Sequence, residues 1–135
     1  MFAPDTKILV VDDMLTMRKI ISKNLKDLGL CNITEANDGA TAWPAVEEAH
    51  KGGTPFQLVL SDWNMPQMSG LDFLKKCRTD DRFKALPFVL ITAESEKSQV
   101  IEAVQAGVSH YIVKPFTADQ LKEKLEVAHK KHSAK

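Results

Sequence analysis

Five polar residues that could act together follow short apolar segments of the chain. Asp12 and Asp13 come directly after one such segment, Asp62 after a second, Thr92 ends a third and Lys114 follows a fourth. If these segments are parallel strands of one open sheet, their carboxyl ends lie at the same edge, where ligands bind in sheets of this kind. The sequence therefore predicts that three carboxylates, a hydroxyl group and an ammonium group meet at that edge.

Three neighbouring carboxylates repel one another and raise one another's pKa values unless a cation is present. Mg²⁺ prefers oxygen ligands, uses one or two carboxylates and leaves positions open for water and phosphate. Because no histidine or cysteine accompanies these aspartates, the pattern does not favour zinc. We therefore expect Mg²⁺ as the cofactor of this edge.

A carboxylate beside such a metal could act as a nucleophile toward phosphorus. Phosphoryl transfer depends mainly on positioning and on neutralising charge, and an aspartyl phosphate is an ordinary covalent intermediate. Lys114 could supply a positive charge and Thr92 a hydrogen bond to the transferred group. Alone, the pair of aspartates is as typical of a loop or helix cap as of a functional site, a threonine at a strand end is usually structural, and Lys-Pro is usually a turn. The prediction therefore rests on the four strand ends meeting at one edge.

The elements that would position these residues alternate along the chain, strand then helix, five times. The predicted strands cover residues 7–11, 33–36, 56–61, 87–92 and 110–113, and the predicted helices cover 14–28, about 40–51, 70–78, 94–106 and 118 to about 130. Apolar residues recur at helical spacing in the first, third and fifth helices, with Met14, Met17, Ile21, Leu25 and Leu28 forming the face of the first. This alternation indicates an α/β fold with a parallel sheet covered by helices on both faces.

Two helix starts can be read from capping residues. Thr117 is a typical N-cap for the last helix. Pro44 conflicts with a continuous second helix because proline lacks an N–H and clashes with the preceding turn. Either that helix begins late, with Thr41 as its N-cap, or it is kinked at Pro44, and we expect the late start.

Composition excludes several classes of function. The 135 residues suffice for one domain, and 18 basic residues balance 18 acidic ones, so nothing favours a nucleic-acid or membrane partner. The sequence has no apolar run long enough for a membrane span and no secretory signal at its start. Cys31 and Cys77 lie far apart and are expected to be buried small hydrophobic residues. A cytoplasmic location is the expectation.

Several motifs in combination resemble bacterial response-regulator receiver domains, and more closely the single-domain chemotaxis regulators. They are residues 9–13 (LVVDD), 16–18 (TMR), 61–66 (SDWNMP), 92–94 (TAE), 105–107 (QAG) and 111–117 (YIVKPFT). The resemblance covers about 7–130 and implies a single receiver domain over 1–135. It also implies a flavodoxin-like, doubly wound sheet of five parallel strands in the order 2-1-3-4-5, with five helices.

The resemblance assigns roles at the expected edge. It implies that Asp62 is the phosphoacceptor, and that Asp12, Asp13 and Asp62, with the backbone carbonyl of Asn64, hold Mg²⁺. Lys114 matches the lysine that contacts the phosphoryl group.

Further positions match residues that respond to phosphorylation or tune it. Thr92 and Tyr111 match the switch pair of the family, and the peptide bond before Pro115 matches one that is cis. Asn64 and Glu94 match a pair that tunes the lifetime of the phosphorylated form, here expected to be seconds to a few minutes.

The implied function is that of a chemotaxis response regulator in two-component signal transduction. A CheA-like histidine kinase would phosphorylate Asp62, and the phosphorylated monomer would bind a FliM-like flagellar switch protein and change flagellar rotation. A CheZ-like or other phosphatase is a further expected partner. The protein would catalyse only its own phosphorylation and dephosphorylation and would not otherwise be an enzyme. A phosphate sink or phosphorelay shuttle has the same site chemistry and stays open as an alternative.

Two other classes on related folds fit less well. A flavin carrier needs a Ser-, Thr- and Gly-rich phosphate loop after the first strand, where Asp12 and Asp13 would instead repel phosphate. Haloacid-dehalogenase phosphatases resemble this chain in using an aspartate nucleophile with Mg²⁺, but they carry Asp-x-Asp after the first strand. Glu96 and His110 depart from the familiar chemotaxis sequence on the expected partner face, so they leave the identity of the partner open.

Overall fold

A five-stranded parallel sheet forms the centre of the computed structural model, which describes residues 2–65, 67–92, 97–114 and 116–133. The strands are β1 (Ile8–Val11), β2 (Ile33–Ala36), β3 (Leu58–Asp62), β4 (Phe88–Thr92) and β5 (His110–Val113). Their order is β2-β1-β3-β4-β5, with each neighbouring pair parallel. The predicted fold class and strand order are confirmed.

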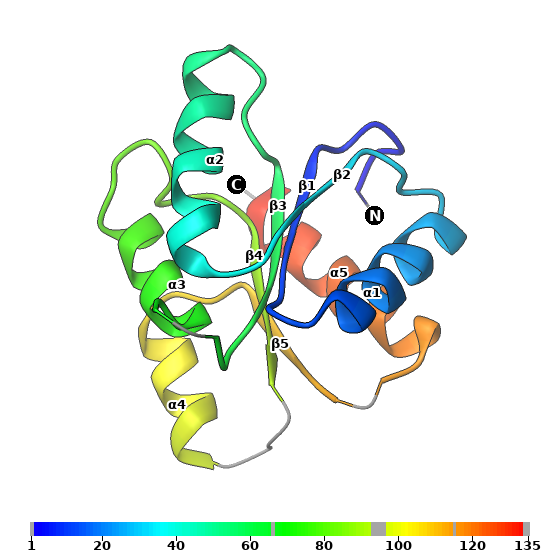
Figure 1. The fold of residues 1–135 in the computed structure, drawn as a ribbon. Helices are drawn as coiled ribbons and strands as arrows, with labels where there is room; N and C mark the ends of the chain where they lie inside the picture. The colour runs from blue at the N-terminus through cyan, green and yellow to red at the C-terminus, as the bar shows by residue number, and fades with distance from the viewer. Residues whose placement is uncertain (1, 66, 93–96, 115, 134–135) are drawn as a thin grey trace.

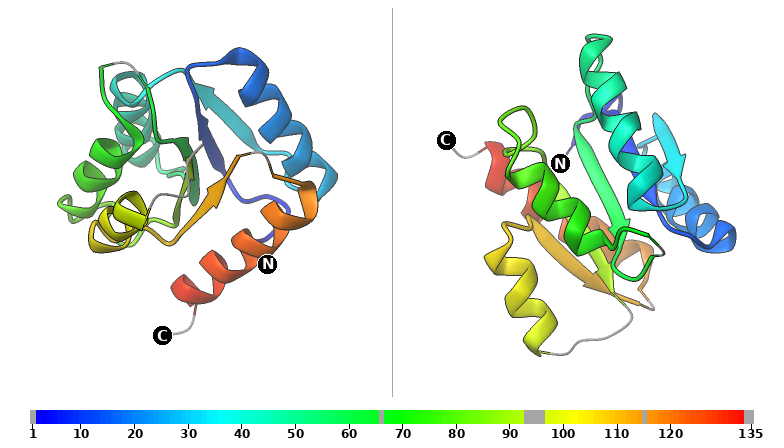
Figure 2. Two further views of the ribbon diagram at one scale, coloured as in Figure 1. Left: turned by 90° about the horizontal axis from the view of Figure 1, so that it is seen from below. Right: turned by 60° about the vertical axis from the view of Figure 1, so that its left-hand side comes forward.

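Helices cover both faces of the sheet (Figure 1). They are α1 (Leu15–Asp27), α2 (Gly39–Lys51), α3 (Gly70–Arg78), α4 (Lys97–Gln105) and α5 (Ala118–Ser133). Figure 2 shows α1 and α5 on one face and α2, α3 and α4 on the other. None of these helices, within the described residues, has the length and apolar character needed to span a bilayer.

Each face of the sheet has its own apolar core because successive side chains of a strand point to opposite faces. In β1, Ile8 and Val10 pack with α1 and α5, whereas Leu9 and Val11 pack with α2 and α3. All four side chains are fully buried. A strand covered on both sides reads as a continuous apolar run, which is the pattern of this segment.

The predicted cap of the last helix is confirmed. The backbone N–H of Gln120 donates to Oγ1 of Thr117 (3.1 Å), and the backbone N–H of Thr117 donates to Oε1 of Gln120 (2.9 Å). Two N–H groups that the helix leaves unpaired are thereby satisfied reciprocally.

The expected late start of the second helix is wrong. Helix α2 begins at Gly39 with Asp38 as N-cap, and Oδ1 of Asp38 accepts the backbone N–H of Thr41 at 2.7 Å. Pro44 therefore lies inside the helix, on its exposed side. The cap and the buried side chain of Ala42 hold the first turn in helical form despite the hydrogen bond that Pro44 cannot make.

Met14 is 60% exposed, contrary to its expected place on the apolar face, because α1 begins one residue later at Leu15. Cys77 is buried as predicted, but Cys31 is exposed, so its expected burial is wrong. The predicted start of the fourth helix at 94 lies outside the described residues.

Candidate functional site

The predicted polar residues meet at the edge formed by the carboxyl ends of the strands, the edge seen from below in Figure 2. Asp12 and Asp13 follow β1 directly, and Asp62 is the last residue of the neighbouring strand β3. One oxygen from each of these three carboxylates lies within 4.8 Å of the others. Such a spacing is short enough for one cation to contact all three.

Lys114 completes this cluster from the end of β5. Its Nζ lies 3.0 Å from Oδ1 of Asp62 and 3.5 Å from Oδ2 of Asp12. The backbone N–H of Lys114 donates to the carbonyl oxygen of Thr92 at 2.7 Å, which extends the pairing of β4 with β5 by one residue. Strand pairing therefore fixes the backbone of Lys114 beside the end of β4, and the side chain extends from there toward the carboxylates.

The backbone and carboxylate of Asp12 are held on several sides. Its side chain is fully buried, and Oδ1 accepts the backbone N–H of Met14 at 2.9 Å. The backbone N–H of Asp12 donates to Ala36 in β2 (3.1 Å), and its carbonyl oxygen accepts from Nη1 of Arg18 (2.6 Å). Asp13, by contrast, is exposed, so the cluster opens to solvent on its side.

Charge in this cluster is unbalanced without a cation. Burial raises the pKa of Asp62 above its usual value, and the charges of Asp12 and Asp13 act in the same direction against the lowering effect of Lys114. The pKa of Lys114 is raised, because its contacts with Asp62 and Asp12 outweigh the burial that lowers it. Ionising a carboxylate beside two others is costly because their negative charges repel one another. A divalent cation bound among them offsets this repulsion and favours the ionised form.

The donor set fits Mg²⁺. It consists of carboxylate oxygens, with two buried groups and one exposed group, and no histidine or cysteine belongs to this cluster of described residues. Oxygen ligands with room for water suit a hard cation such as Mg²⁺.

The N-terminus of α3 approaches Asp62 closely. Ser69 caps this helix by accepting the backbone N–H of Asp72 at 3.1 Å, and the backbone N–H of Gly70 donates to Trp63 at 2.9 Å. A Cβ atom at Gly70 would collide with the carbonyl oxygen of Asp62. Sequence reasoning placed Gly70 at a helix start without seeing this contact, which no local pattern reveals.

The remaining predicted residues differ in how far the structure describes them. Thr92 is buried at the end of β4, and Tyr111 is half-buried in the adjacent strand β5. Leu90 pairs with Tyr111 and lies two residues before Thr92, so Thr92 and Tyr111 belong to the same face of the sheet. Asn64 is exposed just beyond β3. Glu94 and Pro115 lie outside the described residues.

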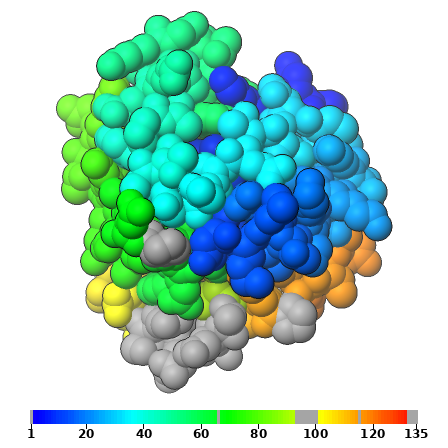
Figure 3. Space-filling view, viewed as in Figure 1, coloured from blue at the N-terminus to red at the C-terminus, as the bar shows by residue number. Residues whose placement is uncertain are grey.

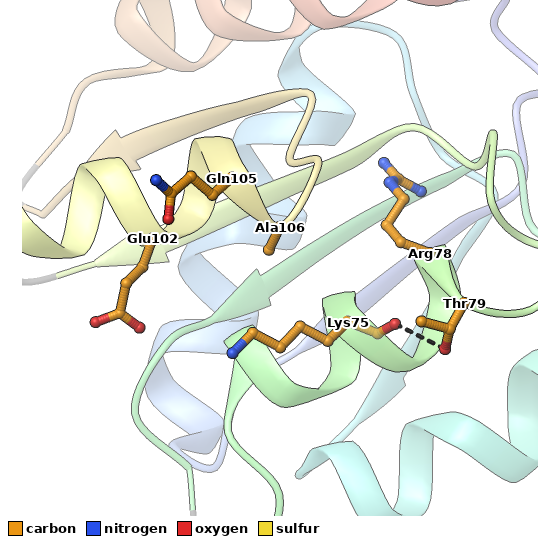
Figure 4. Close-up of a pocket in the computed structure, with 6 residues that line it drawn as sticks. All are labelled: Lys75, Arg78, Thr79, Glu102, Gln105 and Ala106. Carbon is orange, nitrogen blue, oxygen red and sulfur yellow. Dashed lines mark hydrogen bonds between the residues drawn. The ribbon is translucent and has the colours of Figure 1, made fainter.

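A pocket lies apart from this cluster, between α3 and α4 (Figure 4). Its lining residues are Lys75, Arg78, Thr79, Glu102, Gln105 and Ala106. Arg78 spans the two elements, with Nε donating to the carbonyl oxygen of Gly107 (2.8 Å) and Nη1 to that of Phe83 (3.2 Å). This arginine ties the end of α4 to the end of α3.

Comparisons with known proteins agree with this arrangement. The model of the response regulator receiver domain family matches residues 8–126. The chemotaxis protein CheY of Pseudomonas aeruginosa is 53% identical over 120 residues, which cover 89% of this chain and 93% of that protein. The chemotaxis protein CheY1 of Helicobacter pylori is 50% identical over 121 residues, which cover 90% and 94%.

A solved structure gives the same result for the fold. The chemotaxis response regulator CheY4 of Vibrio cholerae superposes with a TM-score of 0.81 at 31% identity, over 92% of this chain and 98% of that one. Receiver domains generally bind Mg²⁺ at an acidic pocket, and the cluster of Asp12, Asp13 and Asp62 corresponds to it. The chain therefore belongs to the response regulator receiver domain family, and within that family it is CheY-like.

Proposed function

We propose that Asp62 accepts a phosphoryl group from a histidine kinase, and that this event is the input of a chemotaxis signal. The observation that carries the proposal is the ion pair of 3.0 Å between Lys114 and Asp62, set beside two further carboxylates at the edge of a parallel sheet. A buried carboxylate that contacts a lysine and belongs to a cluster able to hold a metal ion suits the charge that develops during phosphoryl transfer.

The metal site in this proposal consists of Asp12, Asp13 and Asp62, with the backbone carbonyl of Asn64 as a further ligand. When bound there, Mg²⁺ supplies neutralisation of the negative charge on the carboxylates and on the phosphoryl oxygens. Asp13 is exposed and Asp12 is fully buried, so the first lies toward solvent and the second anchors the site to β1.

The transfer itself requires one bond to form and one to break. A carboxylate oxygen of Asp62 attacks phosphorus, the bond from phosphorus to the kinase's histidine nitrogen breaks, and the imidazole leaves with the electron pair. Lys114 then moves its contact from the carboxylate to a phosphoryl oxygen, and the hydroxyl of Thr92 donates a hydrogen bond to another. The protein thus catalyses its own phosphorylation. It later catalyses hydrolysis of the aspartyl phosphate, in which water attacks phosphorus and the carboxylate of Asp62 leaves, with Asn64 and Glu94 setting the rate.

Uptake from a small phosphodonor tests the site. With acetyl phosphate and Mg²⁺, the parent protein should become phosphorylated, whereas it should not with a chelator present or after the substitution Asp62→Asn. Asp72→Asn, at an exposed aspartate in α3, is the matched control and should label like the parent. Undiminished labelling of the Asp62→Asn protein would contradict the assignment.

The output we propose is binding of the phosphorylated monomer to a FliM-like flagellar switch protein in the cytoplasm. Two relatives at 50% and 53% identity carry the name chemotaxis protein, which supports this pathway and a CheA-like kinase as donor. Thr92 and Tyr111 lie on one face of adjacent strands, so a shift of the Thr92 hydroxyl toward the phosphoryl group can be followed by the ring of Tyr111.

Binding to a switch-protein peptide separates output from a phosphate sink or phosphorelay shuttle. Beryllofluoride with Mg²⁺ mimics the phosphorylated aspartate, and it should increase the affinity of the parent for the peptide. Lys114→Ala should remove that increase, since the ammonium group links the acceptor to β5. If beryllofluoride loads the site but leaves peptide affinity unchanged, the sink or shuttle becomes the better account.

A further inference from the structure

Arg18, in the first turn of α1, reaches back to the turn that carries two of the acidic residues. Its Nη1 donates to the carbonyl oxygen of Asp12 at 2.6 Å, and its Nε lies 3.0 Å from Oε1 of Glu35 in β2. The side chain of Arg18 is only 15% exposed. One guanidinium group therefore connects α1, the turn after β1 and the edge strand of the sheet.

This contact completes the restraint on the backbone of Asp12. The N–H of Asp12 is already held by Ala36 in β2 (3.1 Å), and Arg18 takes the carbonyl oxygen on the other side of the same residue. With both backbone groups held, the peptide that joins Asp12 to Asp13 has little freedom to rotate. That peptide carries the Cα atoms of both aspartates, so holding it restrains where their side chains start.

The contact needs an arginine. A guanidinium group presents several N–H donors in a rigid planar fork, so it can donate to a carbonyl and to a carboxylate at once. Glu35 orients the fork from the neighbouring strand, and it is more exposed than the arginine, at 36%. A lysine would keep the positive charge, but as a flexible point charge it would not hold both partners in one geometry.

We propose that Arg18 is a positioning residue for the metal site, and that it raises Mg²⁺ affinity by holding the turn from Asp12 to Asp13 in the binding geometry. The inference rests on the proposed function, because it assumes that this acidic cluster is where Mg²⁺ binds. Arg18 touches neither the metal nor the phosphoryl group in this account. It acts through the backbone of Asp12.

Electrostatics alone predicts the opposite sign. The guanidinium group is a positive charge near the cluster, so removing it reduces repulsion of a divalent cation and should tighten binding. A positioning role predicts weaker binding instead, and outer partners of metal ligands typically contribute about tenfold or more to affinity. The direction of the change in Mg²⁺ affinity therefore distinguishes the two.

The test is a calorimetric titration of the unphosphorylated protein with MgCl₂. Arg18→Met keeps the length of the side chain and removes its donors, and Arg18→Lys keeps the charge. Both should weaken Mg²⁺ binding by about tenfold. The matched control is Arg78→Met, because Arg78 is likewise a half-buried arginine that donates to two acceptors, both of them backbone carbonyls, but it lies in the pocket between α3 and α4. The control should bind Mg²⁺ like the parent.

Several outcomes would overturn the inference. Mg²⁺ affinity that is equal to the parent's, or higher, in both Arg18 variants overturns it while leaving the proposed function intact. An equal loss in Arg78→Met would show a general effect of destabilisation and would also overturn it. If Arg18→Met does not fold, Arg18→Lys alone decides by the same criterion. A parent protein that binds no Mg²⁺ would contradict the proposed function as well.

Discussion

At the residue scale, Asp62 carries a charge that folding makes less favourable. Burial raises the pKa of its carboxyl group, with Asp12 and Asp13 adding to the effect. An acid whose pKa is higher in the folded than in the unfolded state lowers stability as pH rises through the interval from about 4 to the folded pKa. The penalty is fully present above the folded pKa and disappears below that interval.

Asp62→Asn should therefore increase the free energy of unfolding at neutral pH when a chelator is present. The increase should shrink as pH falls through the interval, because the parent carboxyl group then becomes neutral as well. Urea unfolding at several pH values measures this, with Asp27→Asn, an exposed aspartate of α1, as the control. A variant that is less stable than the parent at neutral pH would show that the ion pair with Lys114 outweighs burial.

Ser22 is a second residue whose local cost can be measured. Its Oγ is buried in α1 and has no hydrogen-bond partner among the described residues. An unsatisfied buried hydroxyl costs about 1 kcal/mol or more, and alanine is the better helix former. Ser22→Ala should raise the free energy of unfolding by about 1 kcal/mol, measured by urea unfolding. Thr16→Ala, on the exposed side of α1, should give a smaller gain, and equal gains would contradict the role of burial.

At the element scale, the start of α3 and the end of β3 leave no room for a side chain at Gly70. A methyl group there would meet the carbonyl of Asp62 and approach Cδ2 of Leu90 to 2.9 Å, so the helix or the acceptor must move. Gly70→Ala should lower both stability and the rate of phosphorylation by acetyl phosphate.

Gly53→Ala is the matched control for this substitution. Gly53 has a φ of +82° with open space around it, so the change strains only the backbone, at about 1 kcal/mol. It should lower stability without slowing phosphorylation. If Gly70→Ala is phosphorylated at the parent rate, the close approach does not position the acceptor.

Helix α2 offers the second prediction at this scale. Pro44 lies on its exposed side and removes one hydrogen bond of the helix. Pro44→Ala should raise the free energy of unfolding by roughly 1–3 kcal/mol, measured by urea unfolding. Pro55→Ala, in the loop before β3, restores no helical bond and should not stabilise the protein. Equal gains from the two substitutions would show that the restored helical hydrogen bond is not the cause, because the greater freedom of the unfolded chain lowers stability in both variants.

The elements were largely predictable because their signals are local. Buried parallel strands read as apolar runs such as 8–11, and the cap at Thr117 follows a known pairing with Gln120. The start of α2 is an exception, because Pro44 favours a late start whereas the capping aspartate Asp38 begins the helix before it. The residue type of Cys31 predicts burial, but the side chain is exposed in the loop between α1 and β2. The path of a loop cannot be predicted from residue type.

At the scale of the whole molecule, the site depends on the order of the strands. Lys114 and Asp12 are 102 residues apart in sequence, yet they contact each other because β5 and β1 end at the same edge. That convergence could be predicted from the strand-end rule. The contact of Arg18 with the backbone carbonyl of Asp12 could not be predicted in this way. Every residue has a backbone carbonyl, so the pattern of residue types does not show which one accepts a hydrogen bond.

In the proposed function, Asp62 is the residue that accepts the phosphoryl group. Its most direct test is to treat the protein with acetyl phosphate and Mg²⁺, trap the acyl phosphate by borohydride reduction, and locate the modified residue by peptide mass spectrometry. We expect a single modified position, Asp62, which stays unmodified when a chelator is present. Modification of Asp12 or Asp13 in its place, or modification of Asp62 that is independent of Mg²⁺, would contradict this role of Asp62.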